Sequence, residues 1–245
     1  YIQIKNKVAA LGAFKDAAQL DHDLQIKEDA FFNWAKLAFD LNEDTSVFND
    51  YIKTYPAKEQ EQRINSYIAV AALHDRDYEA AVNAYDKIDE LDDDMVSNYM
   101  KANYLRAVQL VESGSFRLAV PCLKAAAYYS ERGSRFNQLA RYWLAESYYR
   151  NDQYDDALNV FQDLYNTSAL YGRPESSLIP YNLAYCHFKK ENYPAAMRWF
   201  DTYLGDPRAG FRKEALERRA DCLFIQKKYK EASEAYELVL ADYFK

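Results

Sequence analysis

The chain has 245 residues and carries 31 Lys and Arg against 38 Asp and Glu, a formal net charge of −7. This balance excludes the basic face on which nucleic-acid-binding domains depend, so no nucleic-acid partner is expected. Only 6 Gly and 6 Pro occur, too few for a fold with many tight hairpins. No apolar run reaches the roughly 18 residues of a membrane-spanning helix. The composition therefore predicts a helical protein and no membrane span in this sequence.

Six segments of the chain repeat one pattern of small residues, which predicts six pairs of antiparallel helices. In each segment an alanine is followed twelve positions later by a second small residue. Two helices approach closely only where the facing side chains are small, so each such pair marks a helix crossing. In chain order the pairs are Ala35 and Val47, Ala69 and Ala81, Ala107 and Ala119, Ala145 and Ala157, Ala184 and Ala196, and Ala220 and Ala232.

An aromatic residue three positions before the second small residue predicts where the second helix of each pair begins. The first copy has Asp44 at this position instead. The segments before the aromatic residues, such as 74–77 and 150–153, are short and polar, as expected of turns that join antiparallel helices. The aromatic residues are Tyr78, Phe116, Tyr154, Tyr193 and Tyr229.

The start of the chain and the longer copies of the pattern carry further expectations. Residues 1–27 fit the trailing half of another copy, with Ala10 and Phe14 in its second helix. The sequence then begins within a repeat, and we expect it to be a fragment of a longer protein, since repeat arrays need capping repeats. Some copies are 38 or 39 residues apart, and their extra residues are expected at 89–94 and 166–174.

The pattern resembles the tetratricopeptide repeat (TPR). The signature of that family is W-x2-L-G-x2-Y, then A-x3-F, then P, on a period near 34. The clearest match runs through Leu144, Ala145, Tyr148, Ala157 and Phe161, with alanine in place of the usual glycine. Six such motifs in phase make a stronger signal than any one of them alone.

The resemblance implies an all-α fold, a right-handed α-solenoid of antiparallel helix pairs that form a TPR superhelix. It also implies a single array over 1–245, with a partial repeat at 1–27 and about six helix-pair repeats over 28–245. Arg106 and Arg219 stand where the family usually has a large apolar residue. We expect these two side chains to pair with acidic residues of neighbouring repeats.

The resemblance further implies a binding surface, because the first helix of each repeat lines the concave face of TPR arrays. Tyrosine suits such a surface, since it offers a large rigid ring and a hydroxyl group. The alternative for each tyrosine is packing between adjacent repeats. No repeat carries the lysine–asparagine pair with which chaperone-binding TPR domains hold a peptide carboxylate, so no such clamp is predicted. The residues expected in this aromatic groove are Tyr104, Tyr142, Tyr149, Arg150, Tyr181, Tyr185, Phe188 and Lys189.

The sequence offers no catalytic or metal-binding motif. The three histidines belong to no zinc-ligand spacing, and 6 glycines leave no room for a phosphate-binding loop. Cys122, Cys186 and Cys222 are odd in number and lack CxxC spacing, so each is expected to be a small buried hydrophobic residue. No metal, no cofactor and no enzymatic activity are predicted.

The predicted function is that of a non-enzymatic protein–protein interaction scaffold with a protein or peptide partner. Two alternatives stay open: a glycan-binding TPR protein of the cell envelope, and a regulatory TPR module of a larger enzyme or regulator. Residues 48–56 carry a narrower resemblance, to repeats of bacterial outer-membrane-assembly lipoproteins and of the cell-division coordinator beside the Tol–Pal system. It implies a bacterial cell-envelope protein, periplasmic or associated with the outer membrane, with the cytoplasm as the alternative location.

Overall fold

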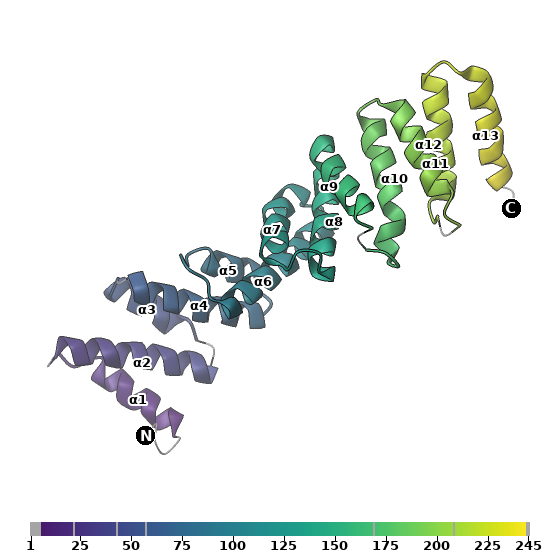
Figure 1. Ribbon diagram of the computed structural model, residues 1–245. Coiled ribbons are helices and arrows are strands. Elements are labelled where there is room, and N and C mark those ends of the chain that lie inside the picture. The colour runs from purple at the N-terminus through teal and green to yellow at the C-terminus, as the bar shows by residue number, and fades with distance from the viewer. Residues whose placement is uncertain are drawn as a thin grey trace. The chain divides into compact units, whose positions relative to one another are not determined.

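The computed structural model describes the backbone of residues 6–21, 23–42, 44–56, 58–168, 170–207 and 209–243, and the side chains of these residues except 58–60 and 242–243. Within these ranges the chain consists of helices and connections, without a strand (Figure 1). The helices are α1 (Lys7–Ala17), α2 (Leu24–Asn42), α3 (Ser46–Thr54), α4 (Lys58–His74), α5 (Tyr78–Tyr85), α6 (Asp93–Glu112), α7 (Phe116–Tyr129), α8 (Arg135–Arg150), α9 (Tyr154–Asn166), α10 (Pro174–Lys189), α11 (Tyr193–Leu204), α12 (Arg212–Ile225) and α13 (Tyr229–Tyr243).

Contacts divide the chain into two compact units, Tyr1–Ala102 and Asn103–Lys245, here called unit 1 and unit 2. The boundary falls within α6, so this helix contributes its first part to unit 1 and its last part to unit 2. The prediction of a single array over 1–245 stays a prediction. The candidate site lies in unit 2, whose later helices stand side by side in chain order (Figure 1).

Consecutive helices pack against one another within each unit, which confirms the predicted all-α fold of antiparallel helix pairs. In unit 1, α4 packs on α5 and α1 on α2. In unit 2 the first helices α8, α10 and α12 each pack on their own second helix and on the second helix of the preceding pair, as α10 does on α11 and on α9. A first helix is therefore covered on two sides, which leaves one remaining face to solvent or a ligand.

The small residues of the repeated pattern lie at the helix crossings, as predicted. All twelve are buried: ten are 0% exposed, Ala232 is 1% exposed and Val47, the largest of them, is 8% exposed. Phe161 and Phe200, large apolar residues one turn further along the second helices, are also 0% exposed, whereas Tyr236 at the same position of the last copy is half-buried. The alignment of copies therefore gives the correct helix faces.

The aromatic residues begin the second helices, as predicted, and a second regularity precedes them. Helices α5, α7, α9, α11 and α13 start at the residues named for this role. Two positions earlier the backbone enters the left-handed region, which reverses the chain between the paired helices. The residues there are Arg76 (φ 62°), Gly114 (75°), Asp152 (60°), Glu191 (58°) and Lys227 (63°).

Gly114 is the one glycine among these five left-handed positions, and its substitution gives a clean test of the turn. Gly114→Ala is expected to lower the free energy of unfolding by roughly 1 kcal/mol, because alanine resists a positive φ. Crowding adds nothing, since a Cβ at this position meets no atom within 4 Å. Gly114→Asn should cost less, because asparagine tolerates this conformation. Urea unfolding followed by circular dichroism measures both.

Gly12 offers a control substitution, for which the opposite change in stability is expected. It lies inside α1 with helical backbone, and a Cβ there also meets no atom within 4 Å. Gly12→Ala is therefore expected to stabilise its helix by roughly 0.5–1 kcal/mol. A stabilising Gly114→Ala would contradict the left-handed turn between α6 and α7.

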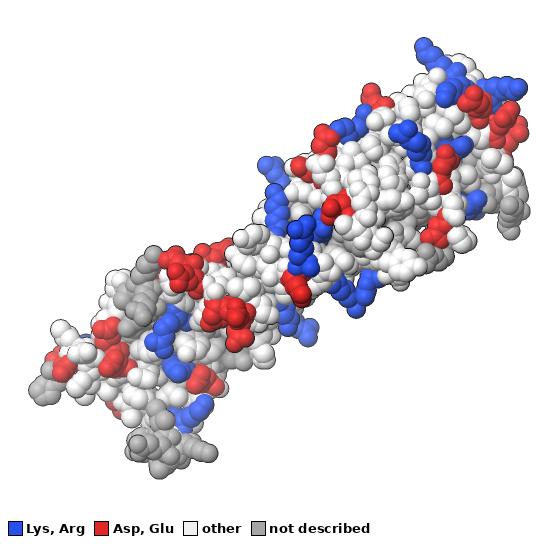
Figure 2. All heavy atoms as spheres, in the orientation of Figure 1, with Lys and Arg blue, Asp and Glu red and all other residues white. Residues whose placement is uncertain are grey.

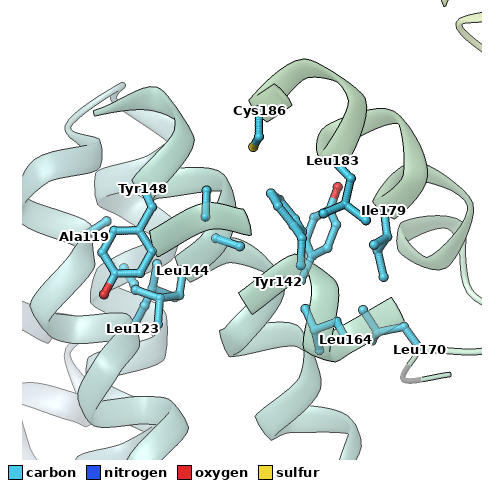
Figure 3. Close-up of a cluster of buried hydrophobic side chains, with 14 of the residues drawn as sticks. Ala119, Leu123, Tyr142, Leu144, Tyr148, Leu164, Leu170, Ile179, Leu183 and Cys186 are labelled. Carbon is cyan, nitrogen blue, oxygen red and sulfur yellow. The ribbon is translucent and has the colours of Figure 1, made fainter. Parts of the chain in front are cut away.

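The main core of unit 2 lies beneath the candidate site. Figure 3 shows Tyr142 pointing from α8 toward Leu183 and Ile179 of α10, with Leu164 of α9 below its ring. Cys186 belongs to the same cluster and is fully buried. These contacts join two successive repeats, so this core fixes the position of α10 against α8.

The remaining expectations about single residues are met in part. Cys222 is as buried as Cys186, whereas Cys122 is only half-buried. Arg219 of α12 donates a hydrogen bond to Asp201 of α11, the expected pairing between neighbouring repeats. Arg106 donates to Gln109 of its own helix, at 3.4 Å.

No described helix is both long enough and apolar enough to cross a membrane. Among the residues that the structure describes, no three His, Cys, Asp or Glu side chains gather closely enough to hold a metal ion.

Candidate functional site

A pocket of about 210 Å³ lies on unit 2 where three successive first helices, α8, α10 and α12, come together. We call it the tyrosine pocket. The surface over α10 is mainly uncharged on the face shown in Figure 2, with acidic and basic side chains on either side of it. The residues lining the pocket are Glu146, Tyr149, Arg150, Tyr181, Asn182, Tyr185 and Glu214.

The last turns of α8 supply one wall of the tyrosine pocket. Glu146, Tyr149 and Arg150 are three and four positions apart, which places them on one helix face. Arg150 donates from Nε to Glu146 Oε1 at 3.0 Å. The Glu146 side chain is only 15% exposed, so its charge is held at the wall rather than in bulk solvent. The Arg150 guanidinium also lies 5.7 Å from the ring centroid of Phe116.

Helix α10 supplies the aromatic floor. The rings of Tyr181 and Tyr185 are 4.8 Å apart between centroids, and one helical turn separates the two residues. Tyr181 stacks on Phe211 at 5.3 Å, which fixes its ring against the start of the next repeat. The Tyr185 hydroxyl donates a hydrogen bond to Glu214 of α12. The floor is thus tied to the third helix before any ligand arrives.

Asn182 connects the pocket to the core. Its Nδ2 donates to the hydroxyl oxygen of Tyr142 at 3.2 Å. Tyr142 is only 4% exposed and lies beneath the pocket rather than in its wall. The amide therefore satisfies a hydroxyl group that burial removes from water.

Burial raises the pKa of all three pocket tyrosines above the ordinary value of 10. For Tyr149 burial raises the pKa to about 12. Burial raises the pKa of Tyr181 and of Tyr185 as well, and the hydrogen bond to Glu214 adds to the rise for Tyr185. The ionised form is disfavoured because a phenolate would lose hydration and face nearby carboxylates.

The raised pKa of the pocket tyrosines in the folded state predicts that the fold loses stability at alkaline pH. A pKa raised in the folded state means that the neutral phenols stabilise the fold fully below pH 10, and that this contribution disappears as the pH rises through about 12. The unfolding midpoint in urea should fall over that interval, together with the appearance of tyrosinate absorbance. Tyr149→Phe should make the fall shallower. An unchanged slope in that variant would show that Tyr149 titrates as it does in the unfolded chain.

The structure brings together four of the eight residues expected in the groove: Tyr149, Arg150, Tyr181 and Tyr185 line the tyrosine pocket. Tyr142 lies in the core below it. Phe188 packs on Tyr185 and Tyr193, Lys189 is exposed at the end of α10, and Tyr104 lines a different pocket.

That second pocket, which we call the apolar pocket, has a volume of about 240 Å³ and also lies within unit 2. It is formed by α6, α7 and α8. Tyr104 contributes one wall and packs against Phe136 with 4.6 Å between ring centroids. The lining residues are Tyr104, Ala107, Val108, Val111, Glu112, Leu123 and Trp143.

The sequence reasoning missed Asn182 and Glu214. In the repeat alignment, Glu217 is equivalent to Tyr181 and Tyr142. The residue three positions earlier is Glu214 in that repeat, but Leu178 and Leu139 in the two preceding repeats. A carboxylate thus stands where two preceding repeats carry leucine. The replacement of leucine by glutamate at this position of the repeat alignment is the sequence feature that indicates a polar contact there.

Comparison with known proteins supports the fold. Residues 104–171 match the family model described as a tetratricopeptide repeat. The TPR-like repeats of a putative kinesin light chain from Podosopora anserina share 14% identity, cover 74% of this chain and 94% of that chain, and give a TM-score of 0.50. The MamA protein shares 16% identity, covers 75% of this chain and 92% of that chain, and gives a TM-score of 0.51. No curated protein sequence matches this chain significantly.

Proposed function

We propose that this tetratricopeptide-repeat protein is a non-enzymatic scaffold that binds a segment of a partner protein along the first helices of unit 2. The observation that carries the proposal is the tyrosine pocket, whose wall, floor and far side come from α8, α10 and α12. A surface built by three repeats needs the assembled array and has no counterpart in a single helix pair. Its half-buried tyrosines combine apolar area with hydrogen-bonding groups, as binding surfaces do.

The proposed surface is already ordered without a ligand. Tyr185 is held by Glu214, and Arg150 is held by Glu146. Side chains that are fixed before binding lose less conformational entropy when a partner arrives. The same residues offer no nucleophile–base pair, and burial raises the pKa of the nearby Cys186 thiol to about 12, which keeps it unreactive. Both features favour binding over catalysis.

Site-specific photo-crosslinking tests the proposal. A photoreactive phenylalanine analogue placed at Tyr149 should crosslink a partner from lysate of the native source, and the purified partner should then bind the unmodified chain directly. The same analogue at Tyr128 of α7, which is 80% exposed and outside both pockets, is the matched control. Equal crosslinking at the two positions would contradict the assignment of the binding face.

A charge-reversal pair separates binding from folding. Arg150→Glu and Glu214→Arg change pocket side chains that are largely exposed, so the fold should survive, as circular dichroism can verify. Partner binding should change in both variants. A partner that binds both variants with wild-type affinity would show that the tyrosine pocket is not the binding site.

The finer expectations about cellular setting are also proposals. A bacterial envelope location rests on the resemblance of residues 48–56, and fractionation of native-source cells tests it. The glycan-binding and regulatory-module alternatives stay predictions: the first requires a signal on a glycan array, and the second requires a full-length reading frame with a catalytic or regulatory domain.

A further inference from the structure

The apolar pocket and the tyrosine pocket occupy equivalent positions in successive repeats. Three residues that line the apolar pocket correspond to residues of the tyrosine pocket 38 positions later, one repeat further along the chain. Equivalent positions of stacked repeats face the same way, so both pockets belong to one face of unit 2. The corresponding pairs are Val108 and Glu146, Val111 and Tyr149, and Glu112 and Arg150.

The apolar pocket has the chemistry of a receptor for an apolar side chain. Val108 is partly buried, Val111 and Trp143 are partly buried and pack on the main core, and Leu123 is 1% exposed. Only Glu112 brings a charge, and it lies exposed at the end of α6. A large aliphatic or aromatic side chain would cover this surface and remove it from water.

The tyrosine pocket has the chemistry of a receptor for a cation. Three tyrosines, whose ring faces are electron-rich, and two carboxylates, Glu146 and Glu214, line the same space. The one basic lining residue, Arg150, is already paired with Glu146 and lies over the Phe116 ring. Lining charges therefore sum to −1, and the Glu214 carboxylate accepts a hydrogen bond from the neutral hydroxyl group of Tyr185.

Arg218 of α12 also interacts electrostatically with Glu214 and Tyr185, but other carboxylates share its charge. Arg218 of α12 forms ion pairs with Glu217 at 3.6 Å and with Asp221. Two carboxylates thus neutralise its one guanidinium. An anionic ligand would meet Glu146 and Glu214 without a spare cation, whereas a lysine or arginine side chain would compensate the excess charge.

The spacing of the pockets sets the spacing of the ligand groups. First helices of successive repeats are in contact, as Asn182 and Tyr142 show, and packed helices are about 10 Å apart. An extended chain advances about 3.3 Å per residue, so about three residues span that distance. We propose that unit 2 binds an extended peptide with a large apolar residue in the apolar pocket and a lysine or arginine about three residues away in the tyrosine pocket. This inference rests on the scaffold function proposed above.

Selection from a phage-displayed library of random dodecapeptides tests the inference. The wild-type chain should enrich peptides that combine a large apolar residue with Lys or Arg about three positions away. Glu214→Gln should weaken the best such peptide roughly threefold to fivefold, the range for one exposed ion pair. Replacing the basic residue of the peptide by glutamine should weaken wild-type binding equally but leave binding to Glu214→Gln nearly unchanged.

The apolar pocket has its own variant and control. Val108→Glu should abolish selection for the apolar residue, while Leu118→Glu, on an exposed position of α7 outside both pockets, should not. Should Val108→Glu fail to fold, Val108→Thr keeps the side-chain shape and should weaken the same peptide. Enriched peptides without the pattern, or equal binding by Glu214→Gln and wild type, would overturn the two-pocket inference and leave the scaffold proposal intact. Enrichment of no peptide, together with failed crosslinking at Tyr149, would overturn both.

Discussion

Tyr142→Ala is expected to lower the free energy of unfolding of unit 2 by about 3–5 kcal/mol, the range for removing a buried aromatic ring. The ring is 4% exposed and meets Phe161 edge-on at 5.8 Å and Trp143 at 5.6 Å. Leu183 and Ile179 of the next repeat close over it (Figure 3). Its loss would leave a cavity between two repeats, which a rigid helix stack cannot readily collapse. Urea unfolding followed by circular dichroism measures the change.

The matched control is Tyr142→Phe, which keeps the ring and removes only the hydroxyl group. That group accepts one hydrogen bond, from Asn182 at 3.2 Å, so the expected cost is about 0.5–1.5 kcal/mol. An alanine variant as stable as the phenylalanine variant would refute the core position of Tyr142. If the prediction holds, lost partner binding in Tyr142→Ala reports a damaged fold, and the binding site is better tested at Tyr149 and Glu214.

The repeat pattern predicts the helices well because the helix crossing is local in sequence. The two small residues of a pair are twelve positions apart, and both the turn and the two helix faces between them follow from that distance. The positions of Ala145, Ala157 and Tyr154 in the sequence therefore already determine where α8 and α9 cross and where α9 begins. Nothing beyond one repeat is needed to predict this part of the fold.

The candidate site is predicted only in part because its walls come from different repeats. The register of a single helix places Tyr149 and Arg150 on one face, and Tyr181 and Tyr185 on the equivalent face of α10. This register does not determine which side chains of the following repeat cover that face. Glu214 enters the site across the contact of α10 with the next repeat, a distance of 29 positions from its partner Tyr185.

Coverage by the following repeat also explains why tyrosines at equivalent positions have different roles. Tyr104, Tyr142 and Tyr181 occupy one position in three successive repeats. Tyr142 is buried because Ile179 and Leu183 cover it, whereas Tyr104 lines the apolar pocket and Tyr181 the tyrosine pocket. Burial here depends on the side chains of the next repeat, so one repeat's own sequence cannot distinguish a packing tyrosine from a binding one.

Ala145→Leu is expected to destabilise unit 2 by roughly 1–3 kcal/mol, the cost of overpacking a close helix crossing. Ala145 of α8 and Ala157 of α9 are both 0% exposed, and they belong to the same core cluster as Phe161. Three additional carbon atoms must therefore displace either α9 or the Phe161 ring. Leucine is a strong helix former, so an effect of helix propensity would be small. A lowered midpoint in urea would thus report crowding at the crossing.

Asp152→Asn in the adjoining turn is the control for Ala145→Leu. Asp152 has φ 60°, a conformation that asparagine also tolerates, and its side chain only accepts a hydrogen bond from the exposed Tyr154 hydroxyl. Its cost should stay within about 0.5 kcal/mol. Equal destabilisation by the two substitutions would contradict the assigned crossing, since a turn and a core contact would then respond alike. A larger effect at Ala145 would show that closeness between paired helices, rather than turn chemistry, holds the repeat together.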